Sequence, residues 1–187
     1  MNRLIIMKLQ LISLVTALSL SGCIIFPIKK ADVTKPYHDS AIDFKPSNNV
    51  NRVETTGQVI CEAGKPCTEL TFDWKLQSNN LYKVRADLYD QQAYDIQKIV
   101  LKVDGQNYPY MPTNKSVQKP VLASNLINSS NFIEVPASMI NIFYNAKAID
   151  LLVFTDKGEI SHAVLKDGEE SRAFKTFKRG YAQRNNP

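Results

Sequence analysis

The sequence predicts an α+β domain over residues 52–187, with an antiparallel β-sheet of about six strands and one or two helices packed on it. Two observations predict this class. Several short segments alternate apolar and polar residues between turn-forming residues, and two later segments space their apolar residues as a helix does. The clearest alternation is LYKVRADL, residues 81–88, which places Tyr82, Val84, Ala86 and Leu88 on one face and Lys83, Arg85 and Asp87 on the other. We therefore expect one face of this strand to be buried and the other to lie in water.

Tight turns predict two further hairpins. In residues 96–112, Ile99, Leu101 and Val103 alternate and lead to Asp104-Gly105, a favoured two-residue hairpin turn. In residues 148–165 the turn is expected around residues 156–158. The strand before that turn is apolar at every position from 151 to 154, which is typical of a central strand covered on both faces.

Two segments have helical spacing. In residues 135–148, Pro136 stands at the expected first turn, and the apolar stripe consists of Met139, Ile140, Phe143 and Ala146. In residues 170–184, Phe174, Phe177 and Tyr181 fall three and four apart, with Lys175, Lys178 and Arg179 pointing away from them. We expect the second helix to dock its aromatic stripe on the sheet and leave its cations in water. Gly180 is expected to weaken the end of this helix.

The N-terminus has the layout of a secretory signal. Arg3 and Lys8 precede an uncharged, largely apolar segment, residues 9–20, and small residues follow it. About a dozen apolar residues fall short of the roughly 20 that a helix needs to cross a bilayer. Residues 1–22 are therefore predicted to be a cleaved signal peptide, with Met1 or Met7 as the start.

Leu20-Ser21-Gly22-Cys23 resembles the lipobox of bacterial lipoproteins. The resemblance implies cleavage before Cys23, a diacylglycerol thioether on its sulfur and an acyl chain on the new amino terminus. Two or three acyl chains anchor a protein stably where one does not. Ile24 follows the cysteine where aspartate would favour the inner membrane, so the resemblance implies the bacterial outer membrane, with the domain facing the periplasm or the cell surface. Residues 23–51 contain three prolines downstream of the cysteine and no sustained period, and we expect a flexible tether.

Cys61 and Cys67 remain as a pair once Cys23 is assigned to lipidation. An exported chain passes through an oxidising compartment, so we expect these two to form a disulfide. Strand-like segments lie on either side, and Gly64 and Pro66 are turn formers, so the bond is expected to join the end of a β-hairpin. A redox-active or metal-binding pair is the alternative, but the spacing is not CxxC and no histidine lies nearby in sequence.

Catalytic and nucleic-acid-binding patterns are weak in this chain. Residues 23–187 carry a net charge of +3, because Arg3 and Lys8 belong to the signal and leave 21 basic residues against 18 acidic ones. Of the two histidines, His38 lies in the predicted tether, and His162 adjoins Ser161 on a strand, where neighbours point to opposite faces. Asp87, Asp90 and Asp95 lack the spacing of a calcium loop. We therefore predict no enzymatic activity, no cofactor, no metal site and no nucleic-acid partner.

Four tyrosines lie close together in sequence: Tyr89, Tyr94, Tyr108 and Tyr110. Tyrosine is enriched where proteins meet partners, so they are a candidate binding patch. The alternative is that they cover edges of the core with their hydroxyls in water. The sequence thus predicts a lipid-anchored, non-catalytic envelope lipoprotein with a binding or assembly role, its partner an envelope protein or peptidoglycan. The alternatives are a hydrolase acting on peptidoglycan or peptide, and an inhibitor of a host or rival enzyme.

Overall fold

The computed structural model describes residues 44–46, 52–75 and 81–185. The chain divides into two units, Met1–Lys30 and Ala31–Pro187, and all of the described residues lie in the second. Cys23 and His38 lie outside the described residues, as do the predicted signal peptide and most of the predicted tether.

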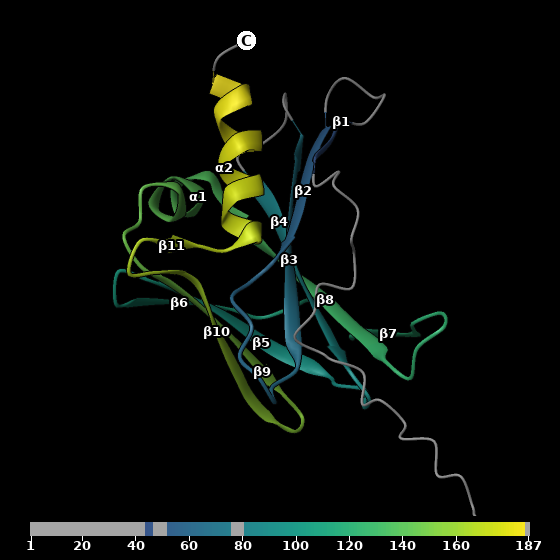
Figure 1. Cartoon of the computed structure of the whole chain (residues 1–187). Helices are drawn as coiled ribbons and strands as arrows, with labels where there is room; N and C mark the ends of the chain where they lie inside the picture. Colours follow the sequence, from purple (N-terminus) through teal and green to yellow (C-terminus); the bar gives the residue numbers. More distant parts are fainter. Residues whose placement is uncertain (1–43, 47–51, 76–80, 186–187) are drawn as a thin grey trace, which may run out of the picture. The chain divides into compact units, whose positions relative to one another are not determined.

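Six strands form the first sheet, in which every pair of neighbours is antiparallel (Figure 1). In spatial order they are β1 (Phe44–Pro46), β2 (Arg52–Gln58), β3 (Cys67–Lys75), β4 (Leu81–Asp90), β8 (Ile127–Pro136) and β7 (Val117–Pro120). The central strand, β4, is the segment whose alternation is clearest in the sequence. The short edge strand β1 lies within residues 23–51, so the sheet begins before residue 52. Three residues are too few to show a period, and this strand therefore left no signal in the sequence.

Five strands form the second sheet, which is also antiparallel throughout. Their order is β11 (Glu169–Glu170), β10 (Gly158–Lys166), β9 (Ile149–Thr155), β5 (Ile96–Val103) and β6 (Gln106–Tyr110). The α+β class is confirmed, but the strands form two sheets and not the single sheet of about six strands that we expected. The period of a strand shows which face is buried and does not show which strand lies beside it.

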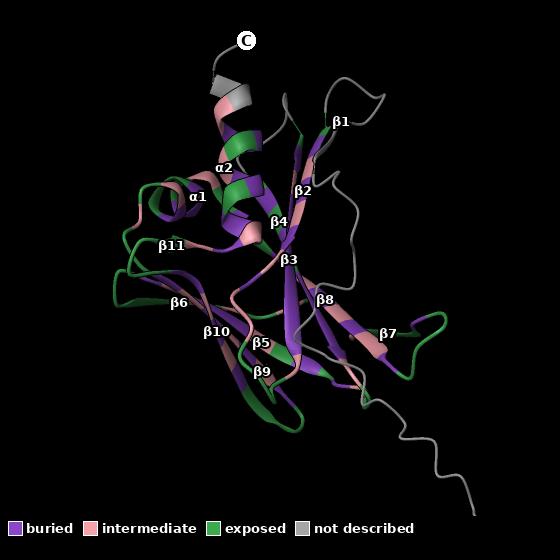
Figure 2. Ribbon diagram, in the orientation of Figure 1, coloured by how far each residue is buried: buried purple, intermediate pink, exposed green. Residues whose placement is uncertain are grey.

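One hydrophobic core lies between the inner faces of the two sheets and the two helices, α1 (Ala137–Tyr144) and α2 (Arg172–Asn185) (Figure 2). Helix α2 packs on β2 and β3, whereas α1 packs on β4 and β8. The ring centroid of Phe72 lies 5.1 Å from that of Phe143 and 4.5 Å from that of Phe177, so one aromatic cluster joins the sheet to both helices. Both predicted helices are confirmed, and the aromatic stripe of α2 is buried as expected.

Two glycines allow α2 to approach β2 closely. A Cβ atom on Gly57 would lie 2.5 Å from the backbone nitrogen of Ala173, and one on Gly180 would lie 2.6 Å from Cγ2 of Thr55. Both distances are shorter than real Cβ contacts allow. Gly180 was expected only to weaken the end of the helix; in the structure it makes room for the sheet.

The predicted turns and the central position of β9 are confirmed, with one change. Asp104 and Gly105 have φ values of 48° and 85°, as a two-residue hairpin turn requires. Strand β9 lies between β10 and β5, but only one of its faces is fully buried, whereas Leu152 and Phe154 on the other are half-buried. The Nζ of Lys98 lies 3.8 Å from the ring centroid of Phe154, so a lysine side chain covers part of this apolar face.

Candidate functional site

The side of the six-stranded sheet that faces away from the core carries most of its charged side chains, and we call it the outer face. Four side chains lie opposite one another across β2, β3, β4 and β8, in the order Glu54, Asp73, Lys83 and Glu134. The next row along the strands is Thr56, Thr71, Arg85 and Phe132. From Asp73 to Lys83 to Glu134 the sign of the charge alternates between neighbouring strands, an arrangement that favours cross-strand pairing, whereas Glu54 and Asp73 are two acids directly opposite each other.

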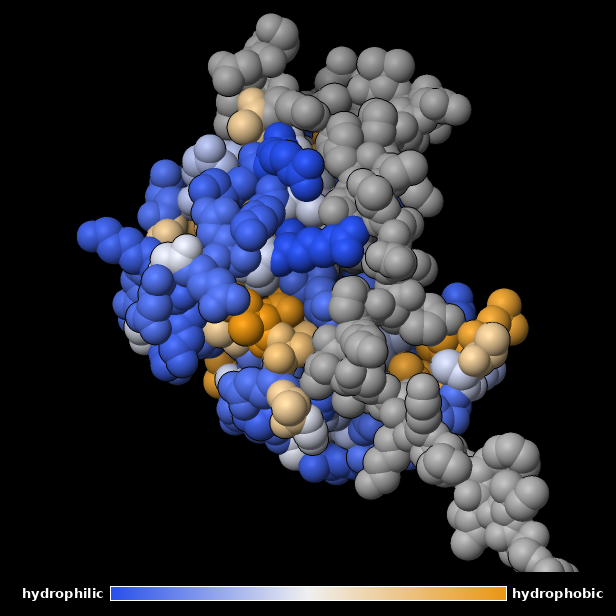
Figure 3. Space-filling model, viewed as in Figure 1, coloured by the Kyte–Doolittle hydropathy of each residue, from blue (hydrophilic) through white to orange (hydrophobic). Residues whose placement is uncertain are grey.

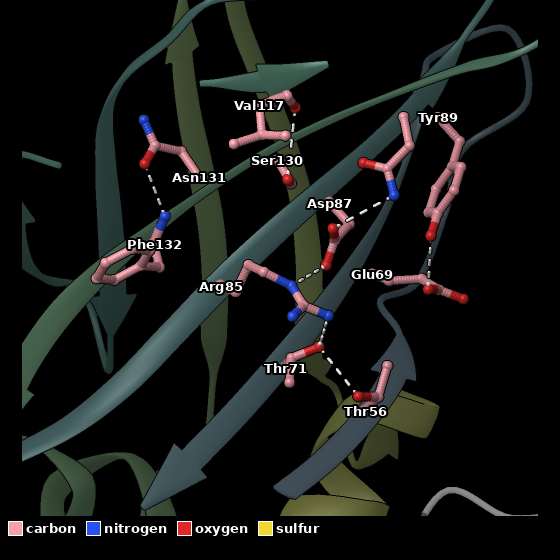
Figure 4. Close-up of polar contacts among 11 residues, drawn as sticks. Thr56, Glu69, Thr71, Arg85, Asp87, Tyr89, Val117, Ser130, Asn131 and Phe132 are labelled. Atoms are coloured by element: carbon pink, nitrogen blue, oxygen red, sulfur yellow. Dashed lines mark hydrogen bonds and ion pairs between the residues drawn. The ribbon is translucent and has the colours of Figure 1, made fainter. Parts of the chain in front are cut away.

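A hydrogen-bonded network crosses the middle of the outer face (Figure 4). The Nε of Arg85 donates to Asp87 Oδ2 at 2.7 Å, and its terminal NH2 donates to Thr71 Oγ1 at 3.3 Å. The hydroxyl oxygen of Thr71 in turn lies within hydrogen-bond distance, 3.0 Å, of the hydroxyl oxygen of Thr56. The side chain of Asp87 is only 5% exposed, whereas that of Arg85 is 44% exposed. The prediction that Asp87 lies in water is wrong, because the ion pair and the neighbouring strands enclose its carboxylate.

The network continues toward the end of the sheet. Tyr89 donates its hydroxyl proton to Glu69 Oε2 at 3.1 Å, and Asn128 Nδ2 donates to Asp87 Oδ1 at 3.4 Å. The pKa of Tyr89 is raised well above its ordinary value, first because burial disfavours the phenolate and then because Glu69 and Asp87 are negative. Tyr89 therefore stays protonated and acts as a hydrogen-bond donor at neutral pH.

A hollow of about 290 Å³ opens at the opposite end of these strands, and we call it the charged hollow. It is lined by Arg52, Asp73, Trp74, Lys75, Leu81, Lys83 and Glu134. Arg52 and Asp73 pair through two parallel bonds, in which the guanidinium spans both carboxylate oxygens, with Nε at 2.6 Å from Oδ1. Lys75 and Glu134 are exposed, and Leu81 is 54% exposed. The hollow thus offers both signs of charge beside apolar surface.

The sequence singled out His162, and the structure places it inside the protein. It is 1% exposed on β10, and its Nε2 lies 2.7 Å from the carbonyl oxygen of Pro66, to which it must donate a proton. Its Nδ1 is also buried and has no hydrogen-bond partner. Burial lowers the pKa of His162, although the Pro66 carbonyl opposes that shift. The neutral imidazole therefore acts as a link between β10 and the loop between β2 and β3.

His162 should make the protein less stable in acid. The unfolded chain binds a proton at this histidine more tightly than the folded one does, because the folded pKa is lowered. The free energy of unfolding should therefore be highest above the unfolded pKa of about 6.5 and should fall as the pH drops below it. Denaturant unfolding between neutral and mildly acidic pH measures this slope.

His162→Gln is the matched control for this prediction. Glutamine keeps a donor for the Pro66 carbonyl but does not titrate, so the variant should lose that part of the slope and keep the part that comes from carboxylates. Equal slopes in the two proteins would show that His162 is not the responsible group.

The predicted disulfide is present and has a structural position. Cys61 and Cys67 are bonded with their Cα atoms 5.3 Å apart, and Cys67 begins β3. The same loop is tied to the second sheet, because Ile60 donates its N–H to the carbonyl of Ala163 at 2.9 Å. With the His162 contact, these bonds fix the end of the β2–β3 hairpin against β10.

The four predicted tyrosines are divided between different surfaces. Tyr89 belongs to the outer-face network and is 8% exposed, and Tyr94 is 5% exposed in the link between the two sheets. Tyr108 and Tyr110 lie half-buried on the edge strand β6, where they pack against the core. The structure thus places Tyr89 in the outer-face network and the other three outside it, none of the four lines the charged hollow described above, and a binding role for the four remains a prediction.

The charged hollow was not anticipated from the sequence. Its charged residues come from polar positions on three consecutive strands and on β8, about fifty residues later in the chain, and each strand by itself shows only an ordinary solvent-facing side. A partial signal was available in TELTFDWK, residues 68–75, where polar residues occupy every second position from Glu69 to Lys75. The partners Lys83 and Glu134 are brought beside Asp73 only by the register.

Comparison with known proteins adds no family. No protein-family model, curated protein or solved structure matches this chain. Within the described ranges, no helix is both long and apolar enough to cross a membrane, and no three His, Cys, Asp or Glu side chains gather as they would around a metal ion. The site has to be interpreted from its own residues.

Proposed function

We propose that this protein is a lipid-anchored lipoprotein of the bacterial outer membrane that binds a partner without catalysis. The anchor is inferred from the resemblance of Leu20-Ser21-Gly22-Cys23 to a lipobox. The observation that carries the binding role is the charged hollow, in which exposed groups of both signs lie beside an exposed leucine. These groups lie on β-strands, which hold side chains in fixed positions and therefore favour specific binding of a partner with matching charges.

The chemistry of the hollow favours a partner with both signs of charge. Lys83 and Glu134 lie directly opposite each other on β4 and β8, and Lys75 adds a second cation. A polyanion would meet Glu134 and Asp73, and a polycation would meet the two lysines. A peptide that carries an ammonium group and a carboxylate suits both, so we propose the peptide part of peptidoglycan or a segment of an envelope protein as the partner.

A non-catalytic role is supported by the position of the histidine that a hydrolase would need. His162 is buried and bonded to Pro66, and Ser161 points from the same strand toward the other face. A general base must reach the proton that it abstracts in the bound substrate. On the outer face, Asp73 and Asp87 are held in ion pairs with Arg52 and Arg85, which does not suit them to proton transfer.

A photo-crosslinking residue at Leu81 tests the binding role in intact cells. Leu81 lines the hollow and is exposed, so the probe would touch a bound partner without removing a charge. We expect a discrete product from position 81 and none from Ser138, which is exposed on α1. The product should form again with purified sacculi or with the purified partner protein.

Charge reversal provides the second arm of that experiment. Glu134→Lys should weaken crosslinking from position 81 about tenfold or more, because it places like charges together in the site. Glu159→Lys makes the same change at an exposed position of β10 beside the β9–β10 turn and should leave the yield unchanged. An equal yield in both variants, or an equal product from position 138, would refute the assignment of the hollow.

A further inference from the structure

The hairpin of β7 and β8 presents one leucine to solvent at its turn. Leu122 is 89% exposed, the highest value among the five large apolar side chains that are exposed in the described part of the chain. Figure 1 shows this hairpin extending from the body of the domain, and Figure 3 shows apolar atoms at its end. A single exposed leucine is common on protein surfaces and needs no explanation. The turn that carries Leu122, however, has an unusual backbone conformation.

The turn is built to hold the leucine outward. Val121 and Ser124 close a β-turn, since the N–H of Ser124 donates to the carbonyl of Val121 at 3.2 Å. Ala123 has a φ of 59°, which a residue with a Cβ seldom adopts and which is required at the third position of a type II turn. Below the turn, Val121 and Leu126 are buried with Tyr89. The loop is thus packed at its base, and its tip keeps a strained backbone that exposes Leu122.

The segment that carries this turn has only positive charge. Residues 105–133 contain Lys115 and Lys119 and no aspartate or glutamate. Lys119 and Val117 are exposed on β7, and Val117 is 51% exposed. Asp90, which lies opposite Ile127 in the register, already accepts bonds from Tyr94 and from the N–H of Gln91. Asp90 keeps its negative charge, but the segment that carries the turn has only cations, and the charge of that segment complements an anionic surface.

We infer that the β7–β8 turn is a membrane-contact loop, with Leu122 inserted between the headgroups of an anionic lipid surface and Lys115 and Lys119 at the phosphates. This inference rests on the proposed lipid anchor, which would keep the domain close to the bilayer. A protein partner suits the tip less well, because a stable protein interface buries about 800 Å² on each side and a single leucine offers far less. A bilayer needs no complementary shape, and apolar insertion together with nearby cations suffices.

A fluorescent label at Asn125→Cys tests the contact. Asn125 is exposed in the turn, so a probe there leaves Leu122 in place. Cys61 and Cys67 are bonded to each other, and Cys23 is blocked by its thioether in the acylated protein and is replaced by serine in the protein without acyl chains, so that only position 125 reacts. The full-length purified protein is mixed with an excess of phosphatidylethanolamine and phosphatidylglycerol vesicles. We expect a blue-shifted emission and quenching by nitroxide-labelled lipids at position 125, and neither from a label at Glu159→Cys, which is exposed on β10.

Two variants separate the apolar and the charged contributions. Leu122→Ser should lower the equilibrium constant for insertion of the label about tenfold, since burying a leucine side chain contributes at least that factor. Replacing both Lys115 and Lys119 with glutamine should lower it about 25-fold on anionic vesicles, at about fivefold for each cation, and should have little effect on phosphatidylcholine vesicles.

The outcomes distinguish this inference from the anchor. Flotation of the whole protein and the mass of residue 23 report acylation, whereas the label reports the loop with or without acyl chains. Acylated protein that floats while position 125 stays as exposed as position 159 would overturn the membrane contact alone. A label protected by an envelope protein and not by vesicles would assign the turn to a protein partner and would also overturn it.

Discussion

Replacing Cys23 with serine is expected to abolish incorporation of radiolabelled or clickable fatty acid. The thioether forms on the sulfur of this cysteine if Leu20–Cys23 is a lipobox, and a serine hydroxyl does not replace it. The variant should also keep its signal peptide and migrate as a larger precursor. Acyl labelling in cells followed by gel electrophoresis measures both effects, and the expected loss is complete.

The other two cysteines provide the control for this prediction. A double variant, Cys61→Ser with Cys67→Ser, removes the disulfide and should retain the acyl label in full. Label that persists in the Cys23→Ser protein, or that disappears only from the double variant, would refute the lipoprotein assignment. The labelling readout does not depend on where the uncleaved signal holds the protein.

Gly57→Ala is expected to produce a large loss of stability in the folded domain. The new methyl carbon would lie 2.5 Å from a backbone nitrogen and 2.6 Å from a backbone carbon of α2, so no side-chain rotation can relieve the clash. Either α2 moves away from β2 or the strand is displaced. Overpacking of this kind typically costs about 1–3 kcal/mol, and we expect the upper end here because the clashing atoms belong to the backbone.

Two matched variants test whether the loss of stability in Gly57→Ala comes from the clash with the backbone of α2. Gly180→Ala meets the Thr55 side chain at 2.6 Å, so it should cost less than Gly57→Ala because a side chain can shift. Glu54→Ala changes the outer face of the same strand and should stay within about 0.5 kcal/mol of the unchanged protein. Denaturant unfolding measures all three. A Gly57→Ala protein as stable as the Glu54→Ala protein would mean that α2 does not approach β2 as closely as described.

The fold class and most of the helices and strands could be predicted from the sequence, because each depends on a local pattern of residues. The alternation from Tyr82 to Leu88 requires a strand with one buried face, and Asp104-Gly105 suits a two-residue turn. The aromatic spacing in α2 identifies its buried stripe. Cys61 and Cys67 were paired in advance because an exported chain with two remaining thiols has only one way to join them.

Other features depended on contacts between distant residues. Asp87 follows the polar period of its strand, yet Arg85 and Asn128 enclose it, and the latter belongs to a strand that the chain reaches some forty residues later. The division into two sheets was missed because nothing in the sequence of residues 91–95, which link β4 to β5, shows that the chain passes there from one sheet to the other. Gly180 resembled a weak helix end until β2 was placed against it.

For this protein, the sequence alone predicted an export signal, a lipobox and the cysteine pair, and it determined the strand and helix periods, because these are properties of neighbouring residues. Only the tertiary structure decided which strands are neighbours, and therefore that Asp73, Lys83 and Glu134 surround one hollow and that Leu122 stands at the tip of a strained turn. Register and close approach arise from packing between segments far apart in the chain, which no local pattern encodes.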